Sequence, residues 1–378
     1  MKKDIKAFVE ENKDAVIETL KELFAIPAPS HFEHERAAYC KRWLENVGAE
    51  GVYIDDALNV IFPINCEGSR EITVFVAHTD TVFPDREPMK LAEEGNILRG
   101  PGIGDDTASV TVLLYVAKYF VENGIKPEKG VLFVCNSCEE GLGNLKGTKQ
   151  LFADYEGRIA KFISFDAKQS SIATRCVGSH RYEVEVMTEG GHSFGAFGHK
   201  NAIAELSHII GEIYDIQVPK IENSKTTYNV GSISGGTSVN TIAQSAKMLC
   251  EYRSDNEDCL AEMKANFEGI FERARKREIE LKVSLIGERP CMGKVDLDAI
   301  ERLRSICADI IMEVTGIEKV GTHSSSTDCN IPLSLGIPAI CMGVYVGGEA
   351  HTREEWVNKD SLPVGLEVGI NVAQALTK

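Results

Sequence analysis

The chain has 378 residues, of which 43% are apolar and 26% are charged, and its formal net charge is −16. This length exceeds what one hydrophobic core usually supports, so two domains are expected. The acidic balance argues against nucleic acid and against an anionic membrane surface as partners, because both attract basic proteins. No apolar run approaches the roughly 18 residues of a membrane span, and the cytoplasm is the expected location.

The first predicted element is an amphipathic helix. Apolar residues recur at helical spacing from Ile5 through Phe8 and Leu20 to Phe24. This pattern differs from the continuous apolar block of a signal peptide.

Four short apolar runs predict strands that are buried on both faces. In chain order they are Ile72–Ala77, Val131–Cys135, Phe162–Phe165 and Ile337–Met342. Between the first two, Asp106–Phe120 predicts a helix after a glycine-rich loop. Strands that alternate with helices indicate a three-layer α/β/α domain with a mainly parallel central sheet.

The pattern changes after about residue 173. Arg181–Thr188 and Ala246–Arg253 alternate polar and apolar residues, which is typical of antiparallel strands with one face in water. Helical patterns cover Asn201–Tyr214 and Asp258–Lys276. We therefore predict an α+β domain of residues 176–286, inserted into a larger domain formed by residues 1–175 and 287–378.

The 11 cysteines are scattered, and only Cys135 and Cys138 have C-x-x-C spacing. Cys135 ends an apolar run, and no second C-x-x-C exists to complete a four-thiolate zinc site. Reduced, partly buried thiols in a reducing compartment are therefore expected.

Each buried strand leads into residues that can bind a metal. His78 and Asp80 follow the first strand, Glu139 and Glu140 the second, Asp166 the third and, a few residues on, His351 the fourth. Because ligands bind beyond the carboxyl ends of the strands in open α/β sheets, these side chains should meet at one place. Imidazoles and carboxylates together favour zinc or a similar divalent cation.

The candidates outnumber the ligands of one tetrahedral ion, so two ions with a bridging carboxylate are expected. Asp105, in the glycine-rich loop Gly100–Asp106, is the natural bridge, while Asp106 is more readily interpreted as a helix N-cap. The loop lacks the Gly-Lys-Ser/Thr ending of a phosphate-binding P-loop. Taken singly, most of these residues could be ordinary surface or capping groups; it is their shared position at strand ends that indicates a site.

In these motifs the chain resembles the M20 family of co-catalytic zinc metallopeptidases, and the resemblance extends almost from end to end. The matching segments are His78–Val82, Gly100–Asp106, Glu139–Gly141, Gly190–Ser193, Asn229–Thr237, Val239–Asn240, Gly336–Ala339 and Ala350–Thr352.

The resemblance implies a role for each matched residue. Asp105 would bridge two divalent ions, Zn²⁺ by preference with Co²⁺ or Mn²⁺ as substitutes, with His78 and Asp166 completing one site and Glu140 and His351 the other. Glu139 would be the general base and Asp80 would orient His78. The inserted domain would act as a lid and as the surface of a homodimer, with His192, Asn240 and Arg253 binding the substrate.

Within the family, the pattern is similar to the tripeptide aminopeptidase-like and glutamate carboxypeptidase-like branch, and the tripeptidase-like members resemble it most. The implied activity is hydrolysis of short peptides. In the resembled family, Asp at the position of Asp166 tends to accompany aminopeptidases and dipeptidases, and Glu accompanies carboxypeptidases and deacylases. Cleavage from the free N-terminus is therefore the leading hypothesis, with an N-acyl amino acid amidohydrolase or a carboxypeptidase as the alternative. A metal-stabilised binding protein without activity is a further alternative, which the presence of all five ligand candidates and Glu139 disfavours.

Overall fold

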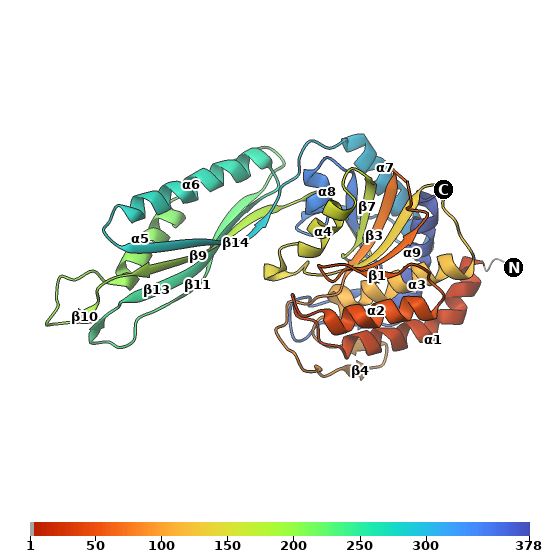
Figure 1. Ribbon diagram of the computed structural model, residues 1–378, viewed down its shortest axis with the longest axis horizontal. Helices are drawn as coiled ribbons and strands as arrows, with labels where there is room; N and C mark the ends of the chain where they lie inside the picture. The colour runs from red at the N-terminus through yellow and green to blue at the C-terminus, as the bar shows by residue number, and fades with distance from the viewer. Residues whose placement is uncertain (1–3) are drawn as a thin grey trace. The chain divides into compact units, whose positions relative to one another are not determined.

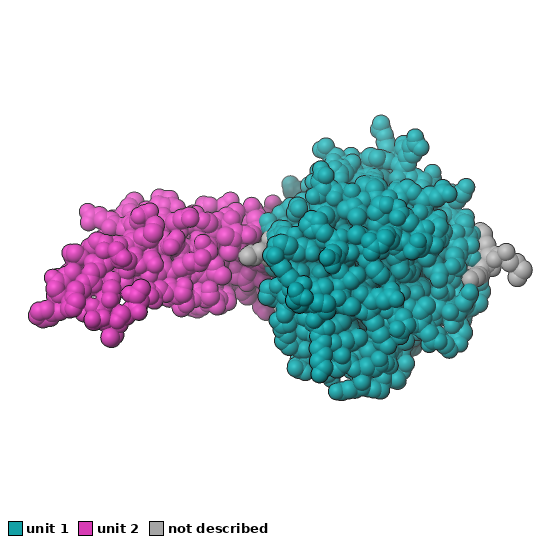
Figure 2. Space-filling model, turned by 60° about the horizontal axis from the view of Figure 1, so that its bottom comes forward, with its two compact units in different colours: residues 1–176, 294–378 teal, residues 177–293 magenta. Residues whose placement is uncertain are grey.

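The computed structural model describes residues 4–378, with the side chain of Leu142 left aside. The chain divides into two compact units, residues 1–176 with 294–378 (unit 1) and residues 177–293 (unit 2), coloured teal and magenta in Figure 2. Residues 1–3 of the expected first domain lie outside the described part. Unit 2 ends at residue 293, whereas the sequence suggested 286, because strand β14 (Glu280–Arg289) pairs with strand β9 (Gly178–Met187) as far as Arg289.

Unit 1 is built on an eight-stranded sheet in the order β1-β2-β6-β3-β7-β16-β8-β15. Its four central strands run parallel: β6 (Gly130–Asn136), β3 (Ile72–His78), β7 (Ile159–Phe165) and β16 (Ala339–Met342). Every residue of β3, β6 and β16 is buried, which explains why these sequences are continuous apolar runs. Strand β16 begins two residues later than predicted, since Pro338 has no N–H to join the ladder.

The outer strands of this sheet are partly antiparallel. Strand β2 (Val60–Ile64) runs antiparallel to β6 and to β1 (Tyr53–Ile54). Strand β8 (Ser171–Cys176) runs antiparallel to β16 but parallel to β15 (Gly321–Ser325). The predicted α/β class with a mainly parallel sheet is confirmed.

Helices lie on both sides of this sheet (Figure 1). Helix α9 packs against α1, α3 and α7, and helix α4 packs against α8. The bounds are α1 (Ile5–Phe24), α2 (His34–Asn46), α3 (Ser109–Glu122), α4 (Lys146–Asp154), α7 (Leu297–Thr315), α8 (Asn330–Ser334) and α9 (Ser361–Leu376). None of the helices in residues 4–378 combines the length and the apolar character that crossing a bilayer requires.

A second, small antiparallel sheet of unit 1 has the order β17-β18-β5-β4. Its strands are β4 (Ala92–Glu94), β5 (Ile97–Arg99), β17 (Gly347–Gly348) and β18 (Trp356–Asn358). Strand β5 runs into the glycine-rich loop, and the β17–β18 connection contains His351. This sheet therefore ties together two segments about 250 residues apart in the sequence, since Trp356 pairs with Arg99.

Unit 2 is an antiparallel sheet with two helices. Strands β11 (Thr226–Gly235), β13 (Ser245–Ser254), β9 and β14 form the sheet in that order, and helices α5 (Ala202–Tyr214) and α6 (Glu257–Arg275) pack against it. Along β9 and β13, buried residues alternate with more exposed ones, as the sequence predicted. The buried side chains form one cluster that includes Val184, Leu206, Met248, Tyr252 and Phe267.

Candidate metal centre

The ends of three parallel neighbours bring the acidic and imidazole groups of unit 1 together. His78 is the last residue of β3, Glu139 and Glu140 follow β6 by three and four residues, and Asp166 directly follows β7. Because β6, β3 and β7 are adjacent and parallel, these groups share one edge of the sheet. Asp105 arrives from the glycine-rich loop.

Asp105 lies between the two imidazoles. Its Oδ1 is 3.2 Å from His78 Nε2, and its Oδ2 is 3.1 Å from His351 Nε2. His351 Nε2 is also 3.1 Å from Glu140 Oε1. One carboxylate therefore presents a different oxygen to each imidazole, which is the arrangement that a bridging ligand needs.

The donor atoms form compact groups that could each hold a cation. His78, Asp105 and Asp166 place one ligand atom each within 4.8 Å of one another, and so do Asp105, Glu140 and His351. His78 also groups with Glu139 and Glu140. The first two groups are those expected from the sequence, and they share Asp105.

Two buried atoms at this point suit a cation. His78 Nε2 and Asp105 Oδ1 have no hydrogen-bond partner among the described residues, although they are only 3.2 Å apart. Buried polar atoms are nearly always satisfied. Two ligands about 2.1 Å from a tetrahedral zinc ion lie about 3.4 Å from each other, so both atoms are placed to share one.

The electrostatics of the cluster also favour a cation. Burial, and after it the charge of Asp105, raises the pKa of Asp166 well above its ordinary value and the pKa of Glu140 to about 7. Hydrogen bonds to Asp105 and Glu140 raise the pKa of His351 to about 10. Burial acts to raise the pKa of Asp105, but its close contacts with the imidazoles of His351 and His78 outweigh burial and lower it. A multivalent cation relieves this mutual repulsion of carboxylates.

Asp80 is fully buried beside His78, but its carboxylate chiefly binds the main chain that carries the two glutamates. Asp80 Oδ1 accepts the Glu139 N–H (2.9 Å) and Oδ2 accepts the Glu140 N–H (3.0 Å). His78 Nδ1 lies 3.0 Å from the main-chain carbonyl oxygen of Asp80 and 3.5 Å from its Oδ1. A proton on Nδ1 is thereby held by the carbonyl, which leaves Nε2 free to bind a cation.

The N-cap interpretation of Asp106 is wrong. Helix α3 begins at Ser109 rather than at Asp106, and a short irregular turn, Ile103–Ala108, precedes it. Asp106 Oδ2 instead accepts the N–H of His78 at 3.0 Å. The carboxylate therefore joins the glycine-rich loop to the end of β3.

Glu355 was missed by the sequence analysis, although it positions the Asp105 loop. Its Oε1 accepts the N–H groups of Gly104 (2.8 Å) and Asp105 (2.7 Å), and its Oε2 accepts that of Gly102 (2.8 Å). A Cβ atom at Gly104 would lie only 3.0 Å from Glu355 Oε1, so the loop can approach the carboxylate because glycine stands there. One acidic residue before a three-residue strand carries no sequence signal of this role.

A buried arginine, Arg36, supports the same region from helix α2. It is 2% exposed and donates to the carbonyls of Ile26 and Thr79 and to the hydroxyl of Thr107. Burial lowers the pKa of this guanidinium to about 10. The Arg36 side chain thus joins the segment after His78 to the segment after Asp105 through Thr79 and Thr107. Nothing in the sequence indicates this role.

The three predicted substrate-binding residues of unit 2 do not lie together. Strand β10 (Gly191–His192) pairs with β12 (Thr241–Ile242), and the Ser193 N–H donates to the Asn240 carbonyl at 2.9 Å, so His192 and Asn240 are neighbours. Arg253 lies near the other end of β13, opposite Ser179, and its guanidinium binds the Glu251 carboxylate at 2.7 and 3.0 Å.

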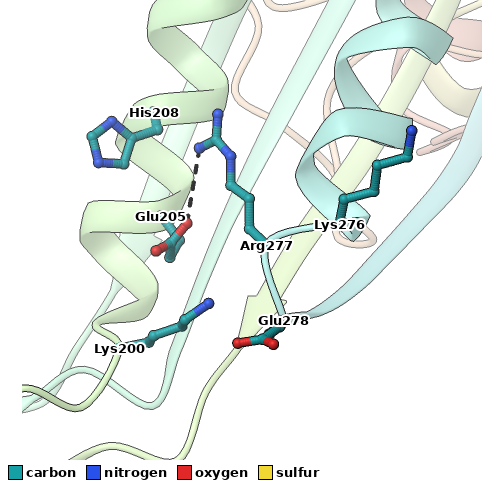
Figure 3. Close-up of a pocket in the computed structure, with 6 residues that line it drawn as sticks. All are labelled: Lys200, Glu205, His208, Lys276, Arg277 and Glu278. Carbon is teal, nitrogen blue, oxygen red and sulfur yellow. Dashed lines mark ion pairs between the residues drawn. The ribbon is translucent and has the colours of Figure 1, made fainter.

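Unit 2 also has a hollow of about 570 Å³ that contains none of the predicted site residues. Figure 3 shows its charged lining, with Arg277 turned toward Glu205, and the two groups are 3.8 Å apart. Arg277 also pairs with Glu212. The lining has mixed charge, with three basic residues, two acidic residues and one histidine, whereas carboxylates predominate in the metal centre.

Acidic and imidazole ligands gathered at the carboxyl edge of an α/β sheet define a metal-dependent hydrolase. The sequence matches the model of Peptidase family M20/M25/M40 over residues 74–375. The chain therefore belongs to this family, whose members hydrolyse amide bonds.

Individual relatives and solved structures agree with this assignment. The chain is 26% identical to carboxypeptidase G2 of Pseudomonas sp., over 93% of this chain and 87% of that protein. It is 23% identical to the succinyl-diaminopimelate desuccinylase of Corynebacterium glutamicum, over 88% of this chain and 89% of that protein. A tripeptidase structure from Staphylococcus aureus has the same fold, with a TM-score of 0.75 at 19% identity over 97% of this chain and 99% of the other.

Proposed function

We propose that this protein is a two-cation exopeptidase that removes residues from the free N-terminus of short peptides. The observation that carries the proposal is the placement of Asp105, whose two oxygens lie 3.2 and 3.1 Å from different imidazoles. His78 and Asp166 would complete one cation site, and Glu140 and His351 the other. Zn²⁺ suits this set of nitrogen and carboxylate ligands, with Co²⁺ or Mn²⁺ as substitutes.

Glu139 and Asp80 have separate roles in the proposed reaction. When bound, two divalent cations would polarise a substrate carbonyl and lower the pKa of a water molecule toward about 7. Glu139 would accept the proton of the attacking water and return it to the leaving amine, a contribution of roughly 10²- to 10⁴-fold. Asp80 would keep Glu139 in reach through the bond to its main-chain N–H, 2.9 Å long.

The choice of a free N-terminus rests on Asp166 and on the resemblance to the tripeptidase-like branch. The names of two sequence relatives favour the second candidate, an N-acyl amino acid amidohydrolase or a carboxypeptidase, since one relative is a carboxypeptidase and the other a desuccinylase. Both candidate enzymes hydrolyse an amide bond at the end of a short substrate, next to a terminal amino acid or acyl group. They differ in what surrounds the scissile bond, so a substrate panel separates them.

We further propose that unit 2, residues 177–293, acts as a lid and forms a homodimer. His192 would stabilise the developing oxyanion, and Asn240 and Arg253 would hold the far end of the substrate. His192 pairs with Thr241, just before the start of β13 at Ser245, whereas Arg253 lies near the end of that strand. Ser245 and Arg253 are eight residues apart, which is roughly 27 Å at about 3.4 Å per residue. One small substrate cannot span that length, which supports sharing between Arg253 of one subunit and the partner subunit's His192. A monomer in sedimentation at working concentration would contradict the dimer.

A cytoplasmic location is part of the proposal. The 11 cysteines are buried, and none forms a disulfide in the described part of the chain, as is usual for thiols in a reducing compartment.

The test combines metal analysis with a substrate panel. We expect the purified protein to bind two cations per subunit, to lose activity on chelation and to regain it with Zn²⁺, Co²⁺ or Mn²⁺. Tripeptides should be cleaved faster than N-acetyl amino acids or N-blocked peptides. Faster cleavage of the blocked substrates would favour the second candidate, and retained metal without any amide cleavage would indicate a binding protein.

A further inference from the structure

A pocket of about 260 Å³ opens beside the candidate metal centre, and all of its lining residues belong to unit 1. Asp105 and Asp166 line it, together with His323, Ser325 and Trp356. Its volume is just below the roughly 300 to 1,000 Å³ of sites for whole small molecules. The pocket therefore suits one side chain or one short acyl group of a substrate, not several residues.

Lys168 is the lysine that lines this pocket. It follows Asp166 by two residues in the turn between β7 and β8, and its main chain forms a bridge with Tyr345. Its carbonyl accepts the Ser171 N–H at 3.0 Å, so the turn that carries it is fixed. Lys168 is exposed, and among residues 4–378 its ammonium forms no ion pair, although the chain has a formal net charge of −16.

No acidic side chain of the pocket is left to bind a cationic group. Three acidic residues line it: Asp105, Asp166 and Glu355. The first two belong to the candidate cation sites, and both oxygens of Glu355 accept main-chain N–H groups. The remaining polar groups include the hydroxyls of Ser171 and Ser325, which can donate, and the Lys168 ammonium, which only donates.

The position of the pocket indicates which part of the substrate enters it. Neither Glu139 nor Glu140 lines it, whereas Asp105 and Asp166 do. The leaving amine must lie within reach of the group that returns its proton, which is Glu139 in the proposed function. The pocket therefore lies on the acyl side of the scissile bond.

We propose that this pocket is the acyl-side subsite and that Lys168 selects a carboxylate there. The inference rests on the proposed amide hydrolysis and adds a substrate class to it. The favoured substrates are peptides whose residue before the scissile bond has an acidic side chain, or amides of a dicarboxylic acid. The second carboxylate of such a substrate binds the Lys168 ammonium and the neighbouring hydroxyls.

The test compares isosteric substrates that differ in one charge. The pairs are Glu-Ala-Ala with Gln-Ala-Ala, and succinyl-alanine with its terminal amide, succinamoyl-alanine, so that either direction of cleavage can be read. The enzymes are the metal-loaded wild type, Lys168→Met, Lys168→Arg and Lys168→Glu. Lys126→Met is the matched control, since Lys126 is exposed, lies near the opposite end of β6 and is outside the pocket.

We expect wild-type kcat/KM to favour the acidic member of a pair by about 2- to 5-fold, the usual effect of an ion pair with an exposed lysine. Lys168→Met should remove most of this preference, Lys168→Glu should invert it, and Lys168→Arg and Lys126→Met should retain it. Equal cleavage of both members by the wild type, or a preference that survives Lys168→Met, would overturn the subsite while leaving amide hydrolysis intact. No cleavage of either pair, together with no activity on the wider amide panel, would instead defeat the proposed function.

Discussion

The main sheets of the two units differ in where they place charged side chains. In unit 1 the central strands are parallel and buried, and charged groups collect beyond their carboxyl ends around Asp105. In unit 2 the strands are antiparallel, and charged groups pair across neighbouring strands, as Arg181 does with Glu251 and Lys247 with Glu183. A parallel sheet concentrates charge at one edge, whereas an antiparallel sheet with a wet face distributes it and neutralises it in pairs.

Among residues 4–378, the groups of side chains that could hold a cation lie in unit 1, and the proposed function places cation binding there. Substitutions in unit 1 should change metal content or proton transfer, while substitutions in unit 2 should change turnover at constant metal content. The following predictions test that division.

The largest effect is expected for Glu139→Gln. The amide cannot accept the proton of water, so kcat should fall by about 10⁴-fold, the upper end for general acid–base catalysis. Metal content should stay at the wild-type level, because Glu139 is not in either of the two groups that share Asp105. Stopped assays with metal analysis on the same samples measure both. Glu128→Gln, at an exposed position of unit 1, is the control, and substantial activity in Glu139→Gln would show that another group is the base.

His192→Ala should have the next largest effect, on turnover only. Loss of one oxyanion donor typically lowers kcat by at least about 10²-fold. Two cations per subunit should remain bound, which elemental analysis can check. His208→Ala, another exposed histidine of unit 2, should behave like the wild type. Loss of metal from His192→Ala would contradict the prediction that substitutions in unit 2 leave metal content unchanged.

Glu355→Gln should lower metal affinity by about 10- to 100-fold, as is usual when a group that orients a ligand is changed. The carboxylate accepts three main-chain N–H groups, and a glutamine would turn its own N–H₂ toward at least one of them. Competition with a fluorescent chelator measures the change. The neighbouring exposed Glu354→Gln is the control, and unaltered affinity in Glu355→Gln would mean that the loop holds Asp105 without this support.

Much of the fold was readable from the sequence because two physical signals are local. Continuous apolar runs marked the buried strands β3, β6, β7 and β16, and alternation marked β9 and β13. The convergence of His78, Asp105 and His351 could also be inferred, since strand ends in such a sheet share one edge.

The groups that support the metal site could not be inferred in this way. Arg36 and Glu355 act on main-chain atoms that are distant in the sequence, such as the Thr79 carbonyl and the Gly102 N–H. Neither residue has a spacing or a neighbour that marks it. Asp106 was misread for a related reason: an acidic residue before a helix normally caps it, and only the tertiary structure shows that its carboxylate binds the His78 N–H at 3.0 Å.

The grip of Asp80 on the main chain has an evolutionary consequence. Because Asp80 binds the N–H groups of residues 139 and 140, it holds their backbone whatever side chains they carry. A glutamate codon becomes a glutamine codon by a single nucleotide change. In the proposed function, a descendant with that change at position 139 would still bind its cations and its peptide but would lack the general base. Such a protein could act as a carrier or a sensor on the same scaffold.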